Sequence, residues 1–109
     1  MPPITIYVDV DDTFIRSAGT KRFPIPAIVA HIRNLHEQGA TLYCWSAGGA
    51  DYARQSAEDA RITNCFIAFL PKPNIILDDQ SPTDWPRCTL IHPATCTAEL
   101  LEQQIQNYK

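Results

Sequence analysis

A short apolar run that ends abruptly in carboxylates constrains the fold more than any other stretch of this chain. Residues 4–10 are mostly β-branched or aromatic, and Asp9, Asp11 and Asp12 close the run. An unbroken apolar run of this length is typical of a strand in a parallel sheet covered on both faces. Three like charges so close together repel one another unless a cation or hydrogen-bond donors neutralise them. A solvated acidic turn is the alternative, but ligands of open α/β sheets bind where strands end, which favours a binding site.

The rest of the chain alternates strand-like and helix-like segments. Four further strands are expected, over 40–45, 65–70, 74–77 and 89–91. Helices are expected over about 26–38, 50–61 and 96–107, and residues 14–26 are expected to form a loop or a small hairpin. Such alternation favours right-handed crossovers and a parallel sheet. The predicted fold is therefore α/β, a three-layer α/β/α sandwich with a mainly parallel five-stranded sheet in one domain over residues 1–109.

Charge, hydropathy and cysteine spacing exclude several classes of protein. A net charge of −3 and a pI near 5.4 give no case for nucleic-acid or membrane binding. No apolar run approaches the ~20 residues that span a bilayer, and Met1-Pro2-Pro3 does not begin a signal peptide. The cysteines have irregular spacing and no CxxC pair, which favours free thiols over disulfides or zinc: Cys44, Cys65, Cys88 and Cys96. The cytoplasm is the expected location.

Polar residues follow each of the first four expected strands. They are Asp9 and Asp11, then Ser46, then Lys72, then Asp78 and Asp79. The ends of parallel strands meet at one edge of a sheet, so these six groups are expected to converge. Phosphoryl transfer requires such a set: a nucleophile, a proton donor, groups that bind the non-bridging oxygens, and a cation. Taken singly, each has an ordinary alternative, with Ser46 as a helix cap, Lys72 as a surface lysine and the acidic pair as a turn.

The ordered set resembles the phosphatases of the haloacid dehalogenase-like (HAD) superfamily. The family pattern stands here as YVDVDDT, LYCWS, PKP and IILDD, in the expected order across residues 4–79. No large insertion interrupts the loops in which relatives carry a cap domain, so the resemblance is to a small capless member. It implies a HAD-like Rossmannoid fold and a Mg²⁺-dependent phosphomonoester hydrolase that acts through an aspartyl-phosphate.

The resemblance also implies a role for each matching residue. Asp9 would be the nucleophile and a metal ligand. Asp11 would be the general acid and then the base, with its backbone carbonyl on the metal. Ser46 and the backbone N–H groups of Ala47 and Gly48 would bind the phosphoryl group.

Three other positions matter to the same resemblance. Lys72 would pair with Asp9 and with the phosphate. Asp78 and Asp79 would hold Mg²⁺, with the direct ligand of the two left open. Thr13 would fix the turn, whereas Asp12 stands where many relatives carry glycine and leaves the turn's conformation open.

Rival interpretations fail on particular residues, with one exception. An EF-hand that began at Asp9 would need Gly and Glu where Phe14 and Thr20 stand. A response-regulator receiver domain would have its hydroxyl and lysine after the last acidic residues, whereas here Ser46 and Lys72 both precede Asp78 and Asp79. A dinucleotide-binding domain would have a glycine-rich first turn, whereas the turn here is acidic. The exception is a catalytically idle HAD-like domain that serves as a binding or regulatory module.

The expected substrate is a phosphorylated small molecule or a larger phosphorylated molecule. A homo-oligomer that covers the bare site is compatible with the sequence. An aromatic ring at Trp85 and cations at Arg16, Lys21 and Arg22 would suit a nucleotide or another phosphorylated ring. The ordinary alternative is that Trp85 anchors its proline-rich loop to the core and that the basic side chains are solvated.

Overall fold

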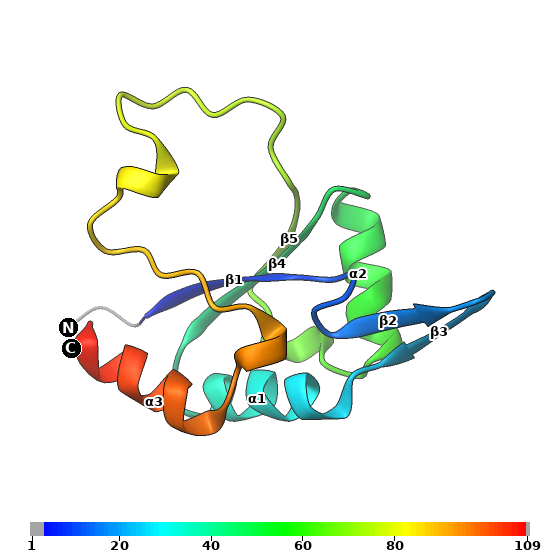
Figure 1. Ribbon diagram of the computed structural model, residues 1–109. Helices are drawn as coiled ribbons and strands as arrows, with labels where there is room; N and C mark the ends of the chain where they lie inside the picture. Colours follow the sequence, from blue (N-terminus) through cyan, green and yellow to red (C-terminus); the bar gives the residue numbers. More distant parts are fainter. Residues whose placement is uncertain (1–3, 109) are drawn as a thin grey trace. The chain divides into compact units, whose positions relative to one another are not determined.

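The computed structural model describes residues 4–108, and the chain divides into two compact units between Lys72 and Pro73. The unit that ends at Lys72 contains five strands, two α-helices and one 3₁₀ turn (Figure 1). In chain order they are β1 (Thr5–Asp9), β2 (Ile15–Ala18), β3 (Lys21–Pro24), α1 (Pro26–Glu37), β4 (Thr41–Ser46), α2 (Ala50–Asp59), η1 (Thr63–Cys65) and β5 (Ala68–Pro71).

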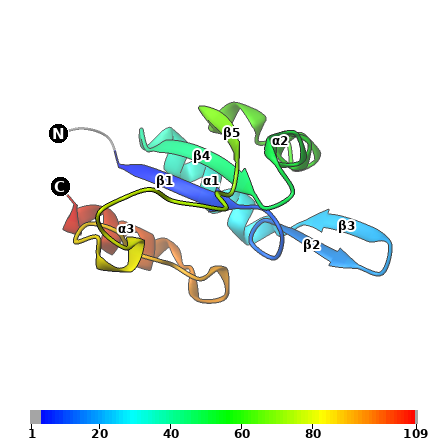
Figure 2. The same ribbon diagram turned by 90° about the horizontal axis from the view of Figure 1, so that it is seen from above.

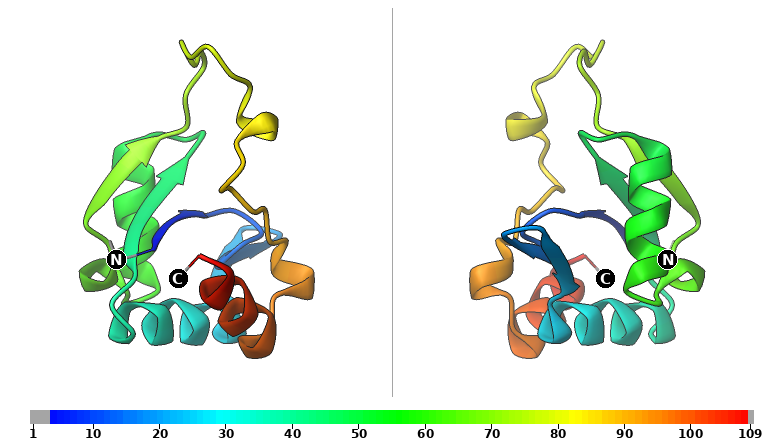
Figure 3. Two further views of the ribbon diagram at one scale, coloured as in Figure 1. Left: turned by 90° about the vertical axis from the view of Figure 1, so that its left-hand side faces the viewer. Right: turned by 90° about the vertical axis from the view of Figure 1, so that its right-hand side faces the viewer.

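The sheet of this unit is parallel and has the strand order β1-β4-β5 (Figures 1 and 3). Asp9 lies opposite Trp45 on β4, and Ser46 lies opposite Pro71 on β5. The carboxyl ends of all three strands therefore reach the same edge of the sheet. The polar residues that follow β1, β4 and β5 are brought to that edge by strand pairing alone.

Alternate residues of β4 form the buried face of the sheet. Leu42 and Cys44 are fully buried, and Ser46 is buried as well. Helix α2 packs on β4 and β5 with Ala53 and Ala57 fully buried, because small side chains allow a helix to approach a sheet closely. Both crossovers lead in the same direction across the sheet, so right-handed connections place α1 and α2 on one face.

Helix α1 confirms the helix expected over about 26–38. It begins with Pro26 at its first position, where a missing N–H costs nothing. Its buried residues recur at helical spacing and form one apolar face: Ile28, Val29, Ile32 and Leu35.

The segment between β1 and α1 is a hairpin, one of the two forms expected for it. Strands β2 and β3 pair antiparallel around Gly19, whose φ of 63° is in the left-handed region that glycine enters freely. Figure 2 shows this hairpin extending away from the end of β1. Phe14 and Ile15 are buried at its base, which fixes the hairpin beside the strand end.

The predicted five-stranded parallel sheet, and with it the three-layer Rossmannoid sandwich, is wrong. The structure has a three-stranded parallel sheet and a separate two-stranded antiparallel one. Within residues 73–108, segments 74–77 and 89–91 form no strand, and Ile75, Leu77 and Leu90 are 85%, 101% and 94% exposed. An apolar run indicates a strand only where another strand accepts its hydrogen bonds, and these short runs have none.

The third expected strand begins later than predicted. Residues 63–65 form the 3₁₀ turn η1, so β5 starts at Ala68 rather than at Cys65. The prediction of a single domain over 1–109 is not tested by the division into units and stays a prediction.

The second unit contains two 3₁₀ turns and one helix, joined by extended chain. They are η2 (Pro82–Asp84), η3 (Pro93–Thr95) and α3 (Ala98–Asn107). Thr97 caps α3, since its side chain accepts the Leu100 N–H at 3.1 Å. No residue of α3 is buried, but Leu101, Ile105 and the adjoining Tyr108 lie at helical spacing and are half-buried. Across residues 4–108 no helix has both the length and the apolar character needed to cross a membrane.

Two leucine substitutions test whether the buried core lies in the parallel sheet and whether segment 74–77 is exposed. Leu42→Ala removes a fully buried side chain from the middle of the parallel sheet and should lower the free energy of unfolding by about 2–5 kcal/mol. Leu77→Ala removes a fully exposed side chain and should change it by less than about 0.5 kcal/mol. Urea unfolding measures both. A large loss for Leu77→Ala would mean that segment 74–77 is buried after all.

Candidate active site

A tight turn at the end of β1 carries the acidic cluster. The carbonyl oxygen of the fully buried Val10 accepts the N–H groups of Thr13, Phe14 and Ile15 at 3.1–3.2 Å. Asp12 has a φ of 60°, the left-handed conformation that glycine adopts most easily and that Asp tolerates better than most residues. The conformation left open by the sequence is therefore settled. The turn needs a left-handed residue at position 12, and Asp12 supplies it.

Asp9 is held by a cation from β5 and by a hydroxyl from its own turn. Lys72 Nζ lies 3.2 Å from Asp9 Oδ1, and Thr13 Oγ1 donates to Asp9 Oδ2 at 3.4 Å. The Lys72 backbone N–H donates to the Ser46 carbonyl at 2.9 Å, which ties the lysine to the end of β4. Both charged side chains are about one-third exposed, so a ligand can reach them. The predicted pairing of Lys72 with Asp9 is present.

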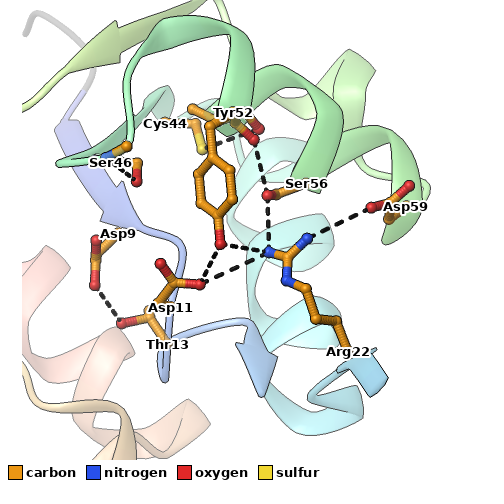
Figure 4. A network of polar contacts seen from close by, with 11 residues as sticks. Asp9, Asp11, Thr13, Arg22, Cys44, Ser46, Tyr52, Ser56 and Asp59 are labelled. Carbon is orange, nitrogen blue, oxygen red and sulfur yellow. Dashed lines mark hydrogen bonds and ion pairs between the residues drawn. The ribbon is translucent and has the colours of Figure 1, made fainter. Parts of the chain in front are cut away.

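Ser46 ends β4 and lies with Asp9 and Asp11 around the same strand ends (Figure 4). Its Oγ accepts the Gly48 N–H at 3.0 Å, and the residue is only 2% exposed. Helix α2 is capped by Gly49, at φ 106°, without a side-chain hydrogen bond, so the alternative role of Ser46 as a helix cap is wrong. The hydroxyl acts as an acceptor in its bond to Gly48, which leaves its own proton for another acceptor. Of the two predicted phosphate-binding amides, Gly48 is engaged and Ala47 is exposed.

Asp11 is held by two residues to which the sequence assigned no such role. The Tyr52 hydroxyl on α2 donates to Asp11 Oδ1 at 2.6 Å, and Arg22 Nη2 on β3 lies 3.7 Å from the same oxygen (Figure 4). The hydrogen bond to Asp11, then burial and the charge of Asp11, raise the pKa of Tyr52, while Arg22 opposes this. The sequence marked Arg22 only as a cation near the site, and nothing in it distinguished Tyr52 from other helix residues.

The other predicted site residues lie in the second unit. Asp78 and Asp79 are both exposed, and Asp78 Oδ1 accepts the Gln80 N–H at 2.9 Å. Because no strand forms over 74–77, the argument that a strand end would direct them to the sheet edge no longer holds. Their role as metal ligands stays a prediction. Trp85 follows η2 and is 37% exposed.

The donor set of the first unit suits a hard divalent cation. Asp9 supplies a carboxylate oxygen from a side chain that is 34% exposed, and the resemblance assigns the backbone carbonyl of Asp11 to the metal. Within residues 4–108 no three His, Cys, Asp or Glu side chains gather into a complete metal centre. Mg²⁺ is commonly held by one or two carboxylates together with waters and substrate phosphate. The oxygen ligands that Asp9 and Asp11 offer are therefore of the type that Mg²⁺ binds, and waters and the phosphate of a substrate would provide the remaining ligands.

Comparisons with protein-family models, with curated proteins and with solved structures return no match for this chain. The resemblance to HAD phosphatases therefore depends on the ordered motifs and on the contacts among their residues.

Two substitutions at position 12 test the turn. Asp12→Gly should leave the free energy of unfolding unchanged or slightly higher, since glycine enters the left-handed region freely. Asp12→Ala should lower it by about 1–2 kcal/mol, because a β-carbon without a polar group is strained there. Thermal unfolding compares the three proteins. Equal stability of the Gly and Ala variants would contradict the left-handed turn.

Cys44 lies under the site and should be inert. Burial, with a smaller contribution from the charge of Asp9, raises the pKa of its thiol to about 12. At pH 9 only about one thiol in a thousand is then ionised, and thiolate is the reactive form. In metal-free buffer Cys44 should resist iodoacetamide up to pH 9, while the exposed Cys88 is alkylated, as peptide mass mapping would reveal. Equal labelling of the two would place Cys44 near the surface.

Proposed function

We propose that the protein is a Mg²⁺-dependent phosphomonoesterase of the HAD type that acts through an aspartyl-phosphate on Asp9. The observation that carries the proposal is the pairing of Asp9 with Lys72 at the edge where β4 ends in Ser46. A nucleophilic carboxylate, a cation and a hydroxyl thus come from three strands that are distant in sequence. The ordinary alternative for Lys72, a solvated surface lysine, would not place its ammonium group on this carboxylate.

The chemistry assigned to these residues divides hydrolysis into two displacements. In the first, an Asp9 carboxylate oxygen attacks phosphorus while the bond to the leaving oxygen breaks, and protonated Asp11 gives its proton to that oxygen. In the second, water attacks the phosphorus of the aspartyl-phosphate, Asp11 takes a proton from the water, and the bond to Asp9 breaks. Inorganic phosphate leaves, and both residues return to their starting forms.

Lys72 and Ser46 would act on the non-bridging oxygens. The ammonium group of Lys72 offsets the charge that a phosphoryl group brings next to Asp9. The Ser46 hydroxyl offers its proton to one of these oxygens. Mg²⁺ held at the strand ends by Asp9 and by the backbone carbonyl of Asp11 would supply further positive charge against the phosphate.

The substrate class follows from this chemistry: a phosphate monoester, small or carried on a larger molecule. The free thiols of Cys44 and Cys65 suit a reducing compartment, so we assign the protein to the cytoplasm.

Turnover of aryl phosphates with and without Mg²⁺ tests the proposal. Asp9→Asn should abolish Mg²⁺-dependent release of phosphate, because an amide is not a nucleophile, and should leave urea unfolding nearly unchanged. Asp11→Asn should slow hydrolysis of phenyl phosphate by on the order of 10²–10⁴, and less for p-nitrophenyl phosphate, whose leaving group needs little protonation.

Asp51→Asn is the matched control, because Asp51 is a fully exposed acid on α2 and, among residues 4–108, forms an ion pair only with its helix neighbour Arg54. It should keep full activity. Wild-type turnover in Asp9→Asn would exclude Asp9 as the nucleophile. Binding of Mg²⁺ and phosphate without any turnover of the wild-type protein would favour the idle binding module.

A further inference from the structure

A chain of hydrogen bonds connects the hairpin, helix α2 and Asp11. Arg22 Nη2 on β3 donates to the Tyr52 hydroxyl at 2.8 Å, and that hydroxyl donates to Asp11 Oδ1 at 2.6 Å (Figure 4). The tyrosine hydroxyl is thus both acceptor and donor, between a cation and a carboxylate. Hydrogen bonds in such a chain polarise one another, which strengthens the donation to Asp11.

Arg22 is fixed on α2 by several contacts in addition to Tyr52. Nη2 also donates to Ser56 Oγ at 3.1 Å, and Nη1 lies 3.8 Å from Asp59 Oδ2. The guanidinium carbon is 4.9 Å from the centre of the Tyr52 ring. Ser56 is fully buried and donates to the Tyr52 carbonyl at 2.8 Å. An arginine with this many partners is not a free cation for substrate, which removes Arg22 from the expected cationic rim.

The loop after β4 is shaped around the Tyr52 ring. A β-carbon on Gly48 would lie 3.0 Å from Cγ and Cδ2 of that ring, tighter than most contacts of real β-carbons, so the ring would have to shift by a few tenths of an ångström. The φ of Gly48 is not in the left-handed region, so the cost of a larger residue comes from the ring and not from the backbone conformation. The loop that carries Ser46 therefore also sets the place of Tyr52.

We propose that Tyr52 and Arg22 are positioning residues that hold Asp11 Oδ1 and leave Oδ2 to exchange protons with the leaving group and with water. This inference rests on the proposed phosphatase function. Tyr52 donates its proton more strongly to the carboxylate than to the carboxylic acid. Its hydrogen bond therefore tightens as Asp11 gives up its proton. The contribution of Tyr52 belongs to the step in which the leaving oxygen is protonated.

The test compares substrates that differ in leaving group. Tyr52→Phe removes the hydroxyl and keeps the ring. It should lower kcat on phenyl phosphate about tenfold, the scale of one hydrogen bond to a charged group, and should leave kcat on p-nitrophenyl phosphate within about twofold. KM should be unchanged for both, because the proposal places the Tyr52 hydroxyl on Asp11 and not on the substrate. Tyr7→Phe is the control, because it removes another tyrosine hydroxyl from the same unit, and it should change neither substrate.

A double variant separates positioning from general support. Tyr52→Phe added to Asp11→Asn should cause no further loss, because Tyr52 acts only through Asp11. Urea unfolding confirms that each variant is folded.

The outcomes distinguish this inference from the proposed function. A wild-type protein without turnover overturns both. Turnover with equal losses on the two substrates, or a full additional loss in the Asp11→Asn background, overturns the positioning role and leaves the phosphatase intact.

Discussion

The parallel pairing of β1 with β4 and of β4 with β5 is the constraint on which the candidate site depends. It brings the carboxyl ends of three strands to one edge of the sheet. The hydrogen bond from the Lys72 backbone N–H to the Ser46 carbonyl extends the pairing of β5 with β4 by one residue. The ammonium group of Lys72 then meets Asp9. Had either neighbour paired antiparallel, the polar residue at its end would lie at the opposite edge of the sheet.

The site balances its charges locally. Asp9 faces Lys72, and Asp11 faces Arg22 through the hydroxyl of Tyr52, so each proposed catalytic carboxylate has its own cation. Without these partners, two carboxylates separated by one residue would raise one another's energy. The two cations also differ in reach. Lys72 stands at the strand ends where a phosphoryl group would bind, whereas Arg22 is bound to α2 by Ser56 and Asp59.

The β2–β3 hairpin is connected to the candidate active site through Arg22. It carries Arg22, and its base is buried through Phe14 and Ile15 next to the acidic turn. A movement of the hairpin that broke the contacts of Arg22 with α2 would therefore also change the hydrogen bonding of Asp11. Gly48 adds a steric requirement from the β4 loop, so three segments that are distant in sequence fix the position of one tyrosine ring.

The sequence by itself predicted β1, α1, β4 and α2 of the first unit and named the candidate catalytic residues, but it left the hairpin open and started β5 too early. The unbroken apolar run before Asp9 and the helical spacing of the buried residues of α1 and α2 are signals that depend only on nearby residues. The tertiary structure decided the contacts between residues that are distant in sequence, which a local hydrophobic pattern does not specify. It left Ile75, Leu77 and Leu90 without strand partners, because strand pairing depends on a partner elsewhere in the chain. It also placed Tyr52 on Asp11, a contact between a helix and a distant turn that a single helix residue gives no means to foresee.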